Sequence, residues 1–273
     1  MIAGTTKSLG QKNQFDKFYT KSSTIQECIK FLNFNEFDCI IEPSAGSGNF
    51  LQFLPHFFAY DIEPEGNNII KADWLTLDKK QFNQYKNILV IGNPPFGVQN
   101  NLAIKFFNVS ASFCDVIAFI LPLSFKKDSI QNKLDLHFHL EQEYILPKKS
   151  FILNGADYDV PCVFQIWRKQ EVLRNKKKMK TTTDLFEFVD KNTADFRIQR
   201  VGGNAGKASF NLDYSAQSNY FIKNKTKYTN EELVKIINSL KFPSIEFSVG
   251  PKSLSKGELI AVLEDALKLK ELN

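Results

Sequence analysis

Apolar and polar positions follow two different patterns along the chain. From about residue 23 to residue 168, short apolar runs alternate with segments whose apolar residues recur at helical spacing. The predicted strands are residues 38–42, 57–62, 68–73, 87–92, 115–121, 143–146 and 160–167. The predicted helices are residues 24–32, 49–54, 101–112 and 129–136. This alternation is typical of βαβ units and a parallel sheet, so functional residues are expected where strands end.

The pattern changes abruptly after Trp167. Residues 168–180 contain seven basic residues and one acid, which predicts either a solvated connector or an arm that contacts phosphates. Beyond this linker we expect helices and strands of a smaller domain. The expected helices are residues 184–189, 231–240 and 256–269, and the expected strands are residues 196–201 and 220–222. The sequence thus predicts a first domain over residues 1–170 and a small α+β domain over residues 171–273.

Composition narrows the class of protein. The 273 residues are 43% hydrophobic and carry 35 Lys and Arg against 30 Asp and Glu, a net charge of +5, which excludes a disordered chain or a disulfide mini-scaffold. The longest apolar run, residues 116–123, is too short to cross a membrane, and the first residues lack a signal-peptide core. We expect a cytoplasmic, nucleoid-associated or viral protein without membrane partners. No CxxC pair or zinc-ligand spacing occurs, so no metal is expected.

A glycine-rich turn follows the first predicted strand. Residues 42–50 read EPSAGSGNF, and the glycines at 46 and 48 let the backbone approach a ligand closely. Asn49 and Phe50 stand where a P-loop needs a lysine and a hydroxyl residue, and Leu51 breaks the dinucleotide G-x-G-x-x-G pattern. The segment predicts a ligand-binding turn of another kind, or else a plain strand-to-helix turn.

Acidic residues mark the ends of the next two predicted strands. Asp61 could accept both hydroxyls of a ribose, and Ile62 beside it could pack on an adenine ring. Asp73, followed by Trp74, could accept a hydrogen bond from an exocyclic amine, although an isolated Asp at a strand end is more often an N-cap. The recurrence of such residues at successive strand ends favours the functional interpretation.

The fourth predicted strand ends in Asn93, Pro94, Pro95 and Phe96. Two adjacent prolines fix the backbone and remove two amide donors, which frees the Pro94 carbonyl from a strand ladder. The Asn93 side-chain oxygen and this carbonyl could hold the two hydrogens of a substrate amine, and Phe96 could stack on a planar substrate. The motif therefore predicts a site at which an amine nitrogen acts as a nucleophile.

These segments together resemble the S-adenosylmethionine-dependent amino-methyltransferases, specifically the N6-adenine nucleic-acid enzymes whose cofactor motifs all precede the catalytic one. The resemblance covers about residues 13–168. Residues 15–20 resemble the family's amino-terminal cofactor motif, and residues 120–125 are similar to its LPxSF-like strand end. It implies a Rossmann-like α/β fold with a seven-stranded, mostly parallel sheet whose last strand, near residues 158–167, is antiparallel. It also implies direct methyl transfer from S-adenosylmethionine to a flipped adenine.

The resemblance assigns roles to individual residues of this sequence. The catalytic residues it implies are Asn93, Pro94, Pro95 and Phe96. The cofactor-binding residues it implies are Phe18, Tyr19, Thr20, Glu42, Pro43, Ser44, Gly46, Gly48, Asp61, Ile62, Asp73, Trp74 and Asn93. Phe96 and Phe151 would hold the base between them, and no metal takes part.

The substrate we expect first is adenine in DNA, read by the second domain. Arg197, Arg200 and Lys207 flank the glycine-rich segment 202–206 and could contact phosphates. An RNA adenine methyltransferase is the alternative, since the net charge suits either polymer. Methylation of a glutamine side-chain amide, or an inactive nucleic-acid-binding subunit, agrees less well with the intact NPPF motif. The sequence is compatible with a restriction endonuclease partner and leaves the oligomeric state open.

Overall fold

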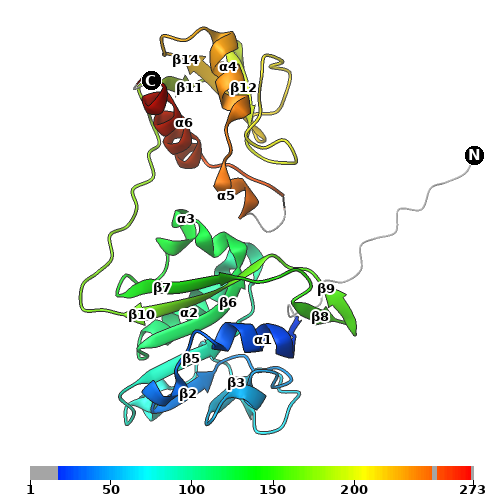
Figure 1. Cartoon of the computed structure of the whole chain (residues 1–273), viewed down its shortest axis with the longest axis vertical. Helices are drawn as coiled ribbons and strands as arrows, with labels where there is room; N and C mark the ends of the chain where they lie inside the picture. Colours follow the sequence, from blue (N-terminus) through cyan, green and yellow to red (C-terminus); the bar gives the residue numbers. More distant parts are fainter. Residues whose placement is uncertain (1–17, 248–250, 272–273) are drawn as a thin grey trace, which may run out of the picture. The chain divides into compact units, whose positions relative to one another are not determined.

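The computed structural model describes residues 18–247 and 251–271 of the chain (Figure 1). Its internal contacts divide it into two compact units. The first unit takes in the chain up to residue 121, with residues 139–160 and 164–169, and the second takes in residues 122–138, 161–163 and 170 onward. The first unit thus ends next to the predicted boundary at residue 170. The second unit also includes two segments that precede this boundary, residues 122–138 and 161–163. None of the described helices is both long and apolar enough to span a bilayer.

One sheet of seven strands has the order β4-β3-β2-β5-β6-β10-β7. Its strands are β2 (Cys39–Glu42), β3 (Phe58–Asp61), β4 (Ile70–Lys71), β5 (Ile88–Gly92), β6 (Val116–Pro122), β7 (Phe138–Ile145) and β10 (Cys162–Lys169). The pairs from β4 to β6 are all parallel. The strand order reverses between β2 and β5, and open α/β sheets bind their ligands at such a reversal. The Rossmann-like α/β fold predicted from the sequence is confirmed.

The three central strands β2, β5 and β6 consist entirely of buried residues. A parallel strand covered on both faces needs a nearly continuous apolar run, and the sequences CIIE, ILVIG and VIAFILP provide it. Glu42 is the single charged residue in these three strands, and it stands at the carboxyl end of β2. A charge in this position needs a functional explanation, because burial of an unpaired carboxylate is costly.

The structure has a helix at each of the four positions predicted in the first domain, but two of these helices are long and two are short. The long ones are α1 (Ser22–Ile29) and α2 (Asn101–Ala111), and the short ones are the 3₁₀ helix η2 (Leu51–Phe53) and α3 (Asp128–Gln131). η2 cannot extend, because Leu54 precedes a proline and adopts an extended conformation. The remaining 3₁₀ helices of the chain are η1 (Phe34–Glu36), η3 (Lys79–Phe82), η4 (Val98–Asn100), η5 (Leu123–Lys126) and η6 (Lys191–Thr193).

A small antiparallel sheet brings distant segments of the first unit together. It has the order β1-β8-β9, with β1 (Tyr19–Thr20), β8 (Phe151–Leu153) and β9 (Ala156–Tyr158). Figure 1 shows β8 and β9 as a hairpin, whose Asn154-Gly155 turn has positive φ at both residues, as a tight hairpin turn requires. Thr20 pairs with Phe151, which is fully buried.

The second unit contains a four-stranded antiparallel sheet with the order β11-β14-β12-β13. Its strands are β11 (Phe186–Phe188), β12 (Phe196–Gln199), β13 (Ala208–Ser209) and β14 (Asn219–Asn224), and its helices are α4 (Asn230–Ser239), α5 (Pro243–Glu246) and α6 (Lys256–Glu271). The sheet and helices share one apolar core. The helix predicted over residues 184–189 is wrong, because Phe186 and Phe188 alternate with the exposed Glu187 in strand periodicity.

We predict that Phe151→Ala lowers the free energy of unfolding of the first unit by about 3 kcal/mol, because it removes a fully buried ring. Urea unfolding followed by tryptophan fluorescence measures this effect selectively, since both tryptophans, Trp74 and Trp167, lie in the first unit. Ile145→Ala is the control, because Ile145 is 54% exposed and its truncation should cost less than about 0.5 kcal/mol. Equal, small effects of both substitutions would contradict the core role of Phe151.

Candidate active site

The side-chain amide of Asn93 is held in one orientation directly after β5. Its Nδ2 donates to the Phe18 carbonyl at 3.4 Å and to Thr20 Oγ1 at 3.3 Å, both on the segment that forms β1. Its Oδ1 is buried and has no hydrogen-bond partner among the described residues. Buried polar atoms are nearly always paired, so an acceptor left in this state is available for a substrate donor.

The Pro94 carbonyl is a second free acceptor beside Asn93. The carbonyls of the next residues bond into the following turn and helix, with Phe96 accepting from Ala103 N and Gly97 from Asn100 N, each at 3.4 Å. No described donor bonds the Pro94 carbonyl. The peptide bonds are trans, and the prolines provide no N–H that could compete. The motif from Asn93 to Phe96 therefore presents two oxygens without a competing donor among the described residues.

The loop after the motif is conformationally strained. Gly97, Gln99 and Asn100 all have positive φ, and two of them are not glycine. A Cβ at Gly97 would lie 2.8 Å from Leu102 Cγ, so glycine is required there for space as well as for conformation. Strain of this kind is common at functional sites, where the surrounding structure fixes an unfavourable backbone.

The glycine turn is tied to both neighbouring strand ends. Ser44 Oγ donates to the Asn93 carbonyl at 3.2 Å, which joins the turn to the motif from Asn93 to Phe96. Asp61 accepts from Gly46 N and Glu63 N, each at 2.8 Å, one on each carboxylate oxygen. Gly46 and Gly48 both have positive φ. Asp61 thus fixes the shape of the turn, and each of its oxygens keeps a further lone pair for a ligand hydroxyl.

β1 lies over this turn. Asn49 Nδ2 donates to the Thr20 carbonyl at 2.8 Å, and Tyr19 Oη donates to Glu65 Oε2 at 2.5 Å. A Cβ at Gly46 would lie 3.8 Å from Tyr19 Cε1, so the tyrosine ring lies close to the turn. The first part of the predicted amino-terminal motif, residues 15–17, lies outside the described residues.

Glu42 is a buried acid at the reversal point of the sheet. Its side chain is 2% exposed, and Oε2 has no hydrogen-bond partner among the described residues. Burial, and secondarily the nearby charge of Asp61, raise the pKa of Glu42 to about 8, so it is mostly protonated at neutral pH. Gly92 makes room for it, because a Cβ there would lie 3.2 Å from Glu42 Cγ. Pro43, next in the chain, is also buried.

Three residues assigned to ligands are engaged elsewhere. Trp74 is 1% exposed and donates from Nε1 to Ser110 Oγ, so its ring is part of the core. Asp73 is exposed, and its Oδ1 accepts from Leu75 N in its own turn. Phe151 has no exposed surface to stack on a base. We therefore leave Trp74 and Phe151 out of the site. Two of the remaining assigned residues differ in exposure. Ile62 is 48% exposed and could still pack on a ring, whereas Phe96 is only 9% exposed.

The cations predicted to contact phosphates differ in availability. Arg197 is 7% exposed, and its guanidinium donates to the Asn211 carbonyl and Asn219 Oδ1, each at 2.7 Å. Its burial and these two hydrogen bonds within the protein favour a structural role for Arg197 over a phosphate contact. Lys207 is exposed and donates to the Asn238 carbonyl, and Arg200 donates from Nη1 to the Gln217 carbonyl. These two side chains keep donors that a ligand could use.

The basic linker uses several of its charges within the protein. The Arg174 guanidinium donates to the carbonyls of Gln131, Leu134 and Phe138, and burial lowers its pKa. Arg168 pairs with two glutamates, and Lys177 pairs with Asp128. These contacts favour the connector interpretation of the linker over an arm whose charges all face a phosphate backbone.

Sequence reasoning missed two residues that the structure places at the site. Asn49 follows Gly48 and could have been found as a polar residue at the turn, although its bond to β1 could not. The Tyr158 ring stacks on Phe18 at 5.1 Å and 10°, and Phe18 bonds Asn93 through its carbonyl. Tyr158 is 40% exposed, and no local sequence signal marks it.

Comparison with known proteins identifies relatives of the first unit. The family described as the EDM2 methyltransferase-like domain matches residues 32–181, more than half of the chain. The protein ENHANCED DOWNY MILDEW 2 of Arabidopsis thaliana is 24% identical over 191 residues, which cover 60% of this chain and 15% of that protein. This chain therefore spans a small part of that relative.

Two solved structures are also similar. One is magnesium protoporphyrin IX methyltransferase of Synechocystis PCC 6803 with bound S-adenosylmethionine, at 11% identity and a TM-score of 0.34, covering 54% of this chain and 77% of that one. The other is the type I restriction-modification system methyltransferase subunit of Streptococcus thermophilus, at 14% identity and a TM-score of 0.43, covering 93% of this chain and 58% of that one.

The family match covers most of the segments that form the candidate site. It includes the glycine turn, Asp61 and the motif from Asn93 to Phe96, and it begins after β1. Methyl transfer is the class of function that the match supports, with S-adenosylmethionine as the cofactor. Over residues 32–181, the chain belongs to the family of EDM2 methyltransferase-like domains.

Proposed function

We propose that this chain methylates the N6 amine of adenine in a nucleic acid, with DNA as the substrate we expect first. The observation that carries this proposal is the buried Asn93 Oδ1, which has no partner while Nδ2 of the same amide is tied to Phe18 and Thr20. An amide fixed in this way presents an acceptor, and an acceptor selects a substrate that donates an N–H.

Two acceptors address the chemical difficulty of an aromatic amine. The nitrogen lone pair of adenine N6 is delocalised into the ring, which makes it a poor nucleophile. When Asn93 Oδ1 and the Pro94 carbonyl accept its two hydrogens, the nitrogen is biased toward a tetrahedral geometry with its lone pair directed at an electrophile. The site therefore acts through positioning and fixed dipoles, and it needs no covalent intermediate on the protein.

The residues around the glycine turn fit S-adenosylmethionine. Bound there, this cofactor supplies a methyl group on a positively charged sulfur. Gly46 and Gly48 leave the turn open to close approach, Asp61 keeps lone pairs for ribose hydroxyls, and Tyr19 could cover the ligand. Glu42 has a buried oxygen without a partner, which suits a cationic ligand. On binding such a ligand, Glu42 should release its proton.

The aromatic face for the target base is best provided by Tyr158 rather than Phe151. Phe18 and Tyr158 form a parallel stacked pair, and the Phe18 carbonyl lies within hydrogen-bond distance of the Asn93 amide. The ring of Tyr158 is 40% exposed, whereas Phe151 is fully buried. A base stacked on Tyr158 would thus lie near the acceptors that hold its amine.

The experiment that tests the function compares acceptors directly. Purified protein is incubated with S-adenosylmethionine labelled in the methyl group and with duplex DNA, single-stranded DNA, RNA or protein, and the modified product is identified by mass spectrometry. We expect N6-methyladenine from DNA. Label confined to RNA would support the alternative substrate, and methylglutamine in protein would contradict the nucleic-acid proposal.

We predict that Asn93→Ala lowers the rate of methyl transfer at least about 100-fold, because it removes the oriented acceptor. Cofactor affinity should change less than about threefold, since the Asn93 side chain contacts β1 and not the glycine turn. Single-turnover kinetics and calorimetric titration measure the two effects separately. Asn87→Ala is the matched control, because Asn87 is exposed and precedes the opposite end of β5. Equal loss of rate and cofactor affinity would assign Asn93 a structural role instead.

We predict that cofactor affinity rises with pH up to about pH 8, because ionised Glu42 attracts the cationic cofactor and its pKa in the free protein is about 8. Below that pH the dissociation constant should increase by up to about tenfold per pH unit. Glu42→Gln should remove this dependence and weaken binding above pH 8. The difference between the two proteins isolates Glu42 from titration of the cofactor itself. The same slope in both would exclude Glu42 from the cofactor site.

The same pKa shift predicts how stability depends on pH. The folded pKa lies above the ordinary value of 4.5, so the folded state binds the proton more tightly than the unfolded state. The contribution of Glu42 is therefore most favourable below about pH 4.5 and is lost as the pH rises through 8. Glu42→Gln should melt at a higher temperature than the natural protein at pH 8.5, with a smaller difference at pH 5. Thermal unfolding in the absence of cofactor measures this.

We predict that Tyr158→Ala raises the KM for an adenine-containing oligonucleotide about tenfold, because loss of one stacking face typically weakens binding by that order. Tyr158→Phe keeps the ring and should retain the natural KM within about twofold. Phe31→Ala is the control, since Phe31 is another exposed ring that contacts a tyrosine, Tyr144, at 5.7 Å. An unchanged KM in Tyr158→Ala would remove Tyr158 from the base-binding face.

A further inference from the structure

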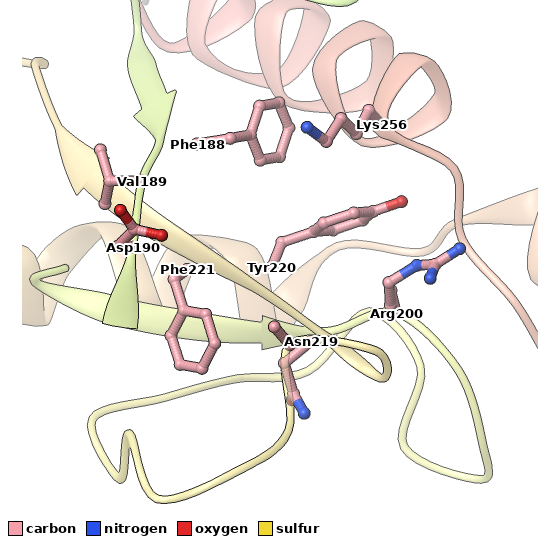
Figure 2. Close-up of a pocket in the computed structure, with 9 residues that line it drawn as sticks. Phe188, Val189, Asp190, Arg200, Asn219, Tyr220, Phe221 and Lys256 are labelled. Atoms are coloured by element: carbon pink, nitrogen blue, oxygen red, sulfur yellow. The ribbon is translucent and has the colours of Figure 1, made fainter. Parts of the chain in front are cut away.

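A separate pocket of about 610 Å³ lies within the second unit (Figure 2). It is lined by β11, β14, the residue after β12 and the first residue of α6. A volume of this size is typical of sites for nucleotide-sized ligands. The predicted functional residues included one member of its lining, Arg200, and none of the others.

The pocket combines aromatic rings with cations. Figure 2 shows Phe188 and Tyr220 close together on the sheet, with Lys256 beside the first and Arg200 beside the second. The two rings meet edge to face at 5.2 Å. Lys256 Nζ lies 4.3 Å from the Phe188 centroid, and Arg200 Cζ lies 5.4 Å from the Tyr220 centroid. Both rings and the arginine are only partly buried, so a ligand can reach them.

The protein does not neutralise these two cations. Neither Arg200 nor Lys256 forms an ion pair with an acid among residues 18–247 and 251–271. Arg200 Nη1 donates to the Gln217 carbonyl, and Arg200 Nε is buried without a partner in the same residues, so the donors left for a ligand are those on the terminal nitrogens. An arginine anchored at one end with donors left over is well suited to bind a phosphate. Asp190, which also lines the pocket, adds a carboxylate that could accept from the amine of a base.

The distribution of charge in the sequence points to a polyanionic ligand for this part of the chain. Residues 171–273 contain 18 Lys and Arg against 13 Asp and Glu, a net charge of +5. Residues 1–170 contain 17 of each, so the entire net charge of the chain belongs to the later segment. A region with this excess attracts nucleic acid electrostatically, independently of sequence.

We propose that this pocket binds an unpaired nucleotide of a nucleic-acid strand, with the base on the Phe188 and Tyr220 rings and the phosphate on Arg200 and Lys256. The aromatic pair distinguishes the site from a surface that only contacts phosphates, because base stacking requires a base outside a duplex. The pocket therefore predicts a preference for single-stranded nucleic acid, or for duplexes with an unpaired end or loop. This inference deepens the proposed function, and it rests on a nucleic acid being the substrate.

The test measures binding of a fluorescein-labelled ten-nucleotide single-stranded DNA to the full chain by anisotropy, at several salt concentrations. Two variants probe the two halves of the site. Phe188→Leu removes a ring but keeps an apolar side chain, and the double variant Arg200→Gln, Lys256→Gln removes the cations but keeps amide donors. The matched control is Lys235→Gln, Lys241→Gln, which removes two exposed cations of the same unit that do not line the pocket. Circular dichroism melting confirms that each variant is folded.

We expect Phe188→Leu to weaken binding at least about fivefold and the cation double variant at least about tenfold. The double variant should also reduce the slope of log affinity against log salt by about 0.7, since the two cations share one phosphate and each neutralised phosphate on a single strand contributes about 0.7. The control should change affinity less than about twofold. A duplex of the same sequence should bind more weakly than the single strand.

Several outcomes would overturn the inference. These are an effect of the cation variant with none of Phe188→Leu, an equal loss in the control variant, or tighter binding of the duplex. Competition with free AMP tests whether the pocket also binds a nucleotide that is not part of a strand. Displacement of the oligonucleotide by AMP below 1 mM, lost in Phe188→Leu, would show that the pocket takes a nucleotide without the strand, which contradicts a strand-specific site.

The methyl-transfer assay described under the proposed function is run on the same preparations, so that failure of the binding site can be distinguished from failure of the enzymatic function. Pocket-dependent binding without any methyl transfer would contradict the enzymatic function and leave the binding site standing. Transfer to nucleic acid that is unaffected by the pocket variants, at subsaturating substrate, would contradict the binding site and leave the function standing.

Discussion

The chemistry of the site depends on the two hydrogen bonds that tie the Asn93 amide to β1. A free asparagine side chain could present its NH₂ group to a substrate as readily as its oxygen, and only the oxygen can receive an amine hydrogen. Phe18 and Thr20 occupy the NH₂ group, which leaves the unpaired Oδ1 as the group available to an amine. β1 in turn exists because it pairs with β8, more than 120 residues later. The orientation of one amide is therefore a product of the folded unit as a whole, and no short motif could provide it alone.

A second constraint comes from placing an acid inside an apolar sheet. The strands around Glu42 have room for its side chain only because residue 92 is a glycine, and they offer Oε2 no hydrogen-bond partner. Burial is tolerated because Glu42 is mostly protonated at neutral pH, with its pKa raised to about 8. A group of this kind couples the arrival of a cation to the loss of a proton. The ionised form of Glu42 is unfavourable in the free protein, and a cationic ligand can stabilise it. This distinguishes the site from one whose charges are already paired before a ligand binds.

The sequence predicted the sheet well, because parallel strands are short apolar runs, and it also predicted that the candidate site lies where these strands end. It failed where side-chain direction depends on distant pairing. The sequence predicts Phe151 as a base-stacking residue, but its ring is fully buried in the structure. The exposed ring of Tyr158, in contrast, has no local signal in the sequence. The burial of Trp74 and Arg197 could not be predicted for the same reason, since each side chain bonds a residue far along the chain. Residues 184–189 were assigned to a helix because a short apolar run does not by itself distinguish the two periodicities.

The chain separates two physical tasks between its segments. In the proposed reaction a neutral amine is held by neutral acceptors, and the motif from Asn93 to Phe96 provides an amide oxygen and a carbonyl oxygen that have no hydrogen-bond donor among the described residues. A nucleic-acid strand must be held by positive charge, and the net charge of +5 belongs entirely to residues 171–273. Cations placed at the amine would compete for the acceptors that activate it, since lysine and arginine only donate. The balanced charge of the first 170 residues is therefore consistent with the proposed amine chemistry, and the positive excess beyond them is consistent with the proposed nucleic-acid substrate.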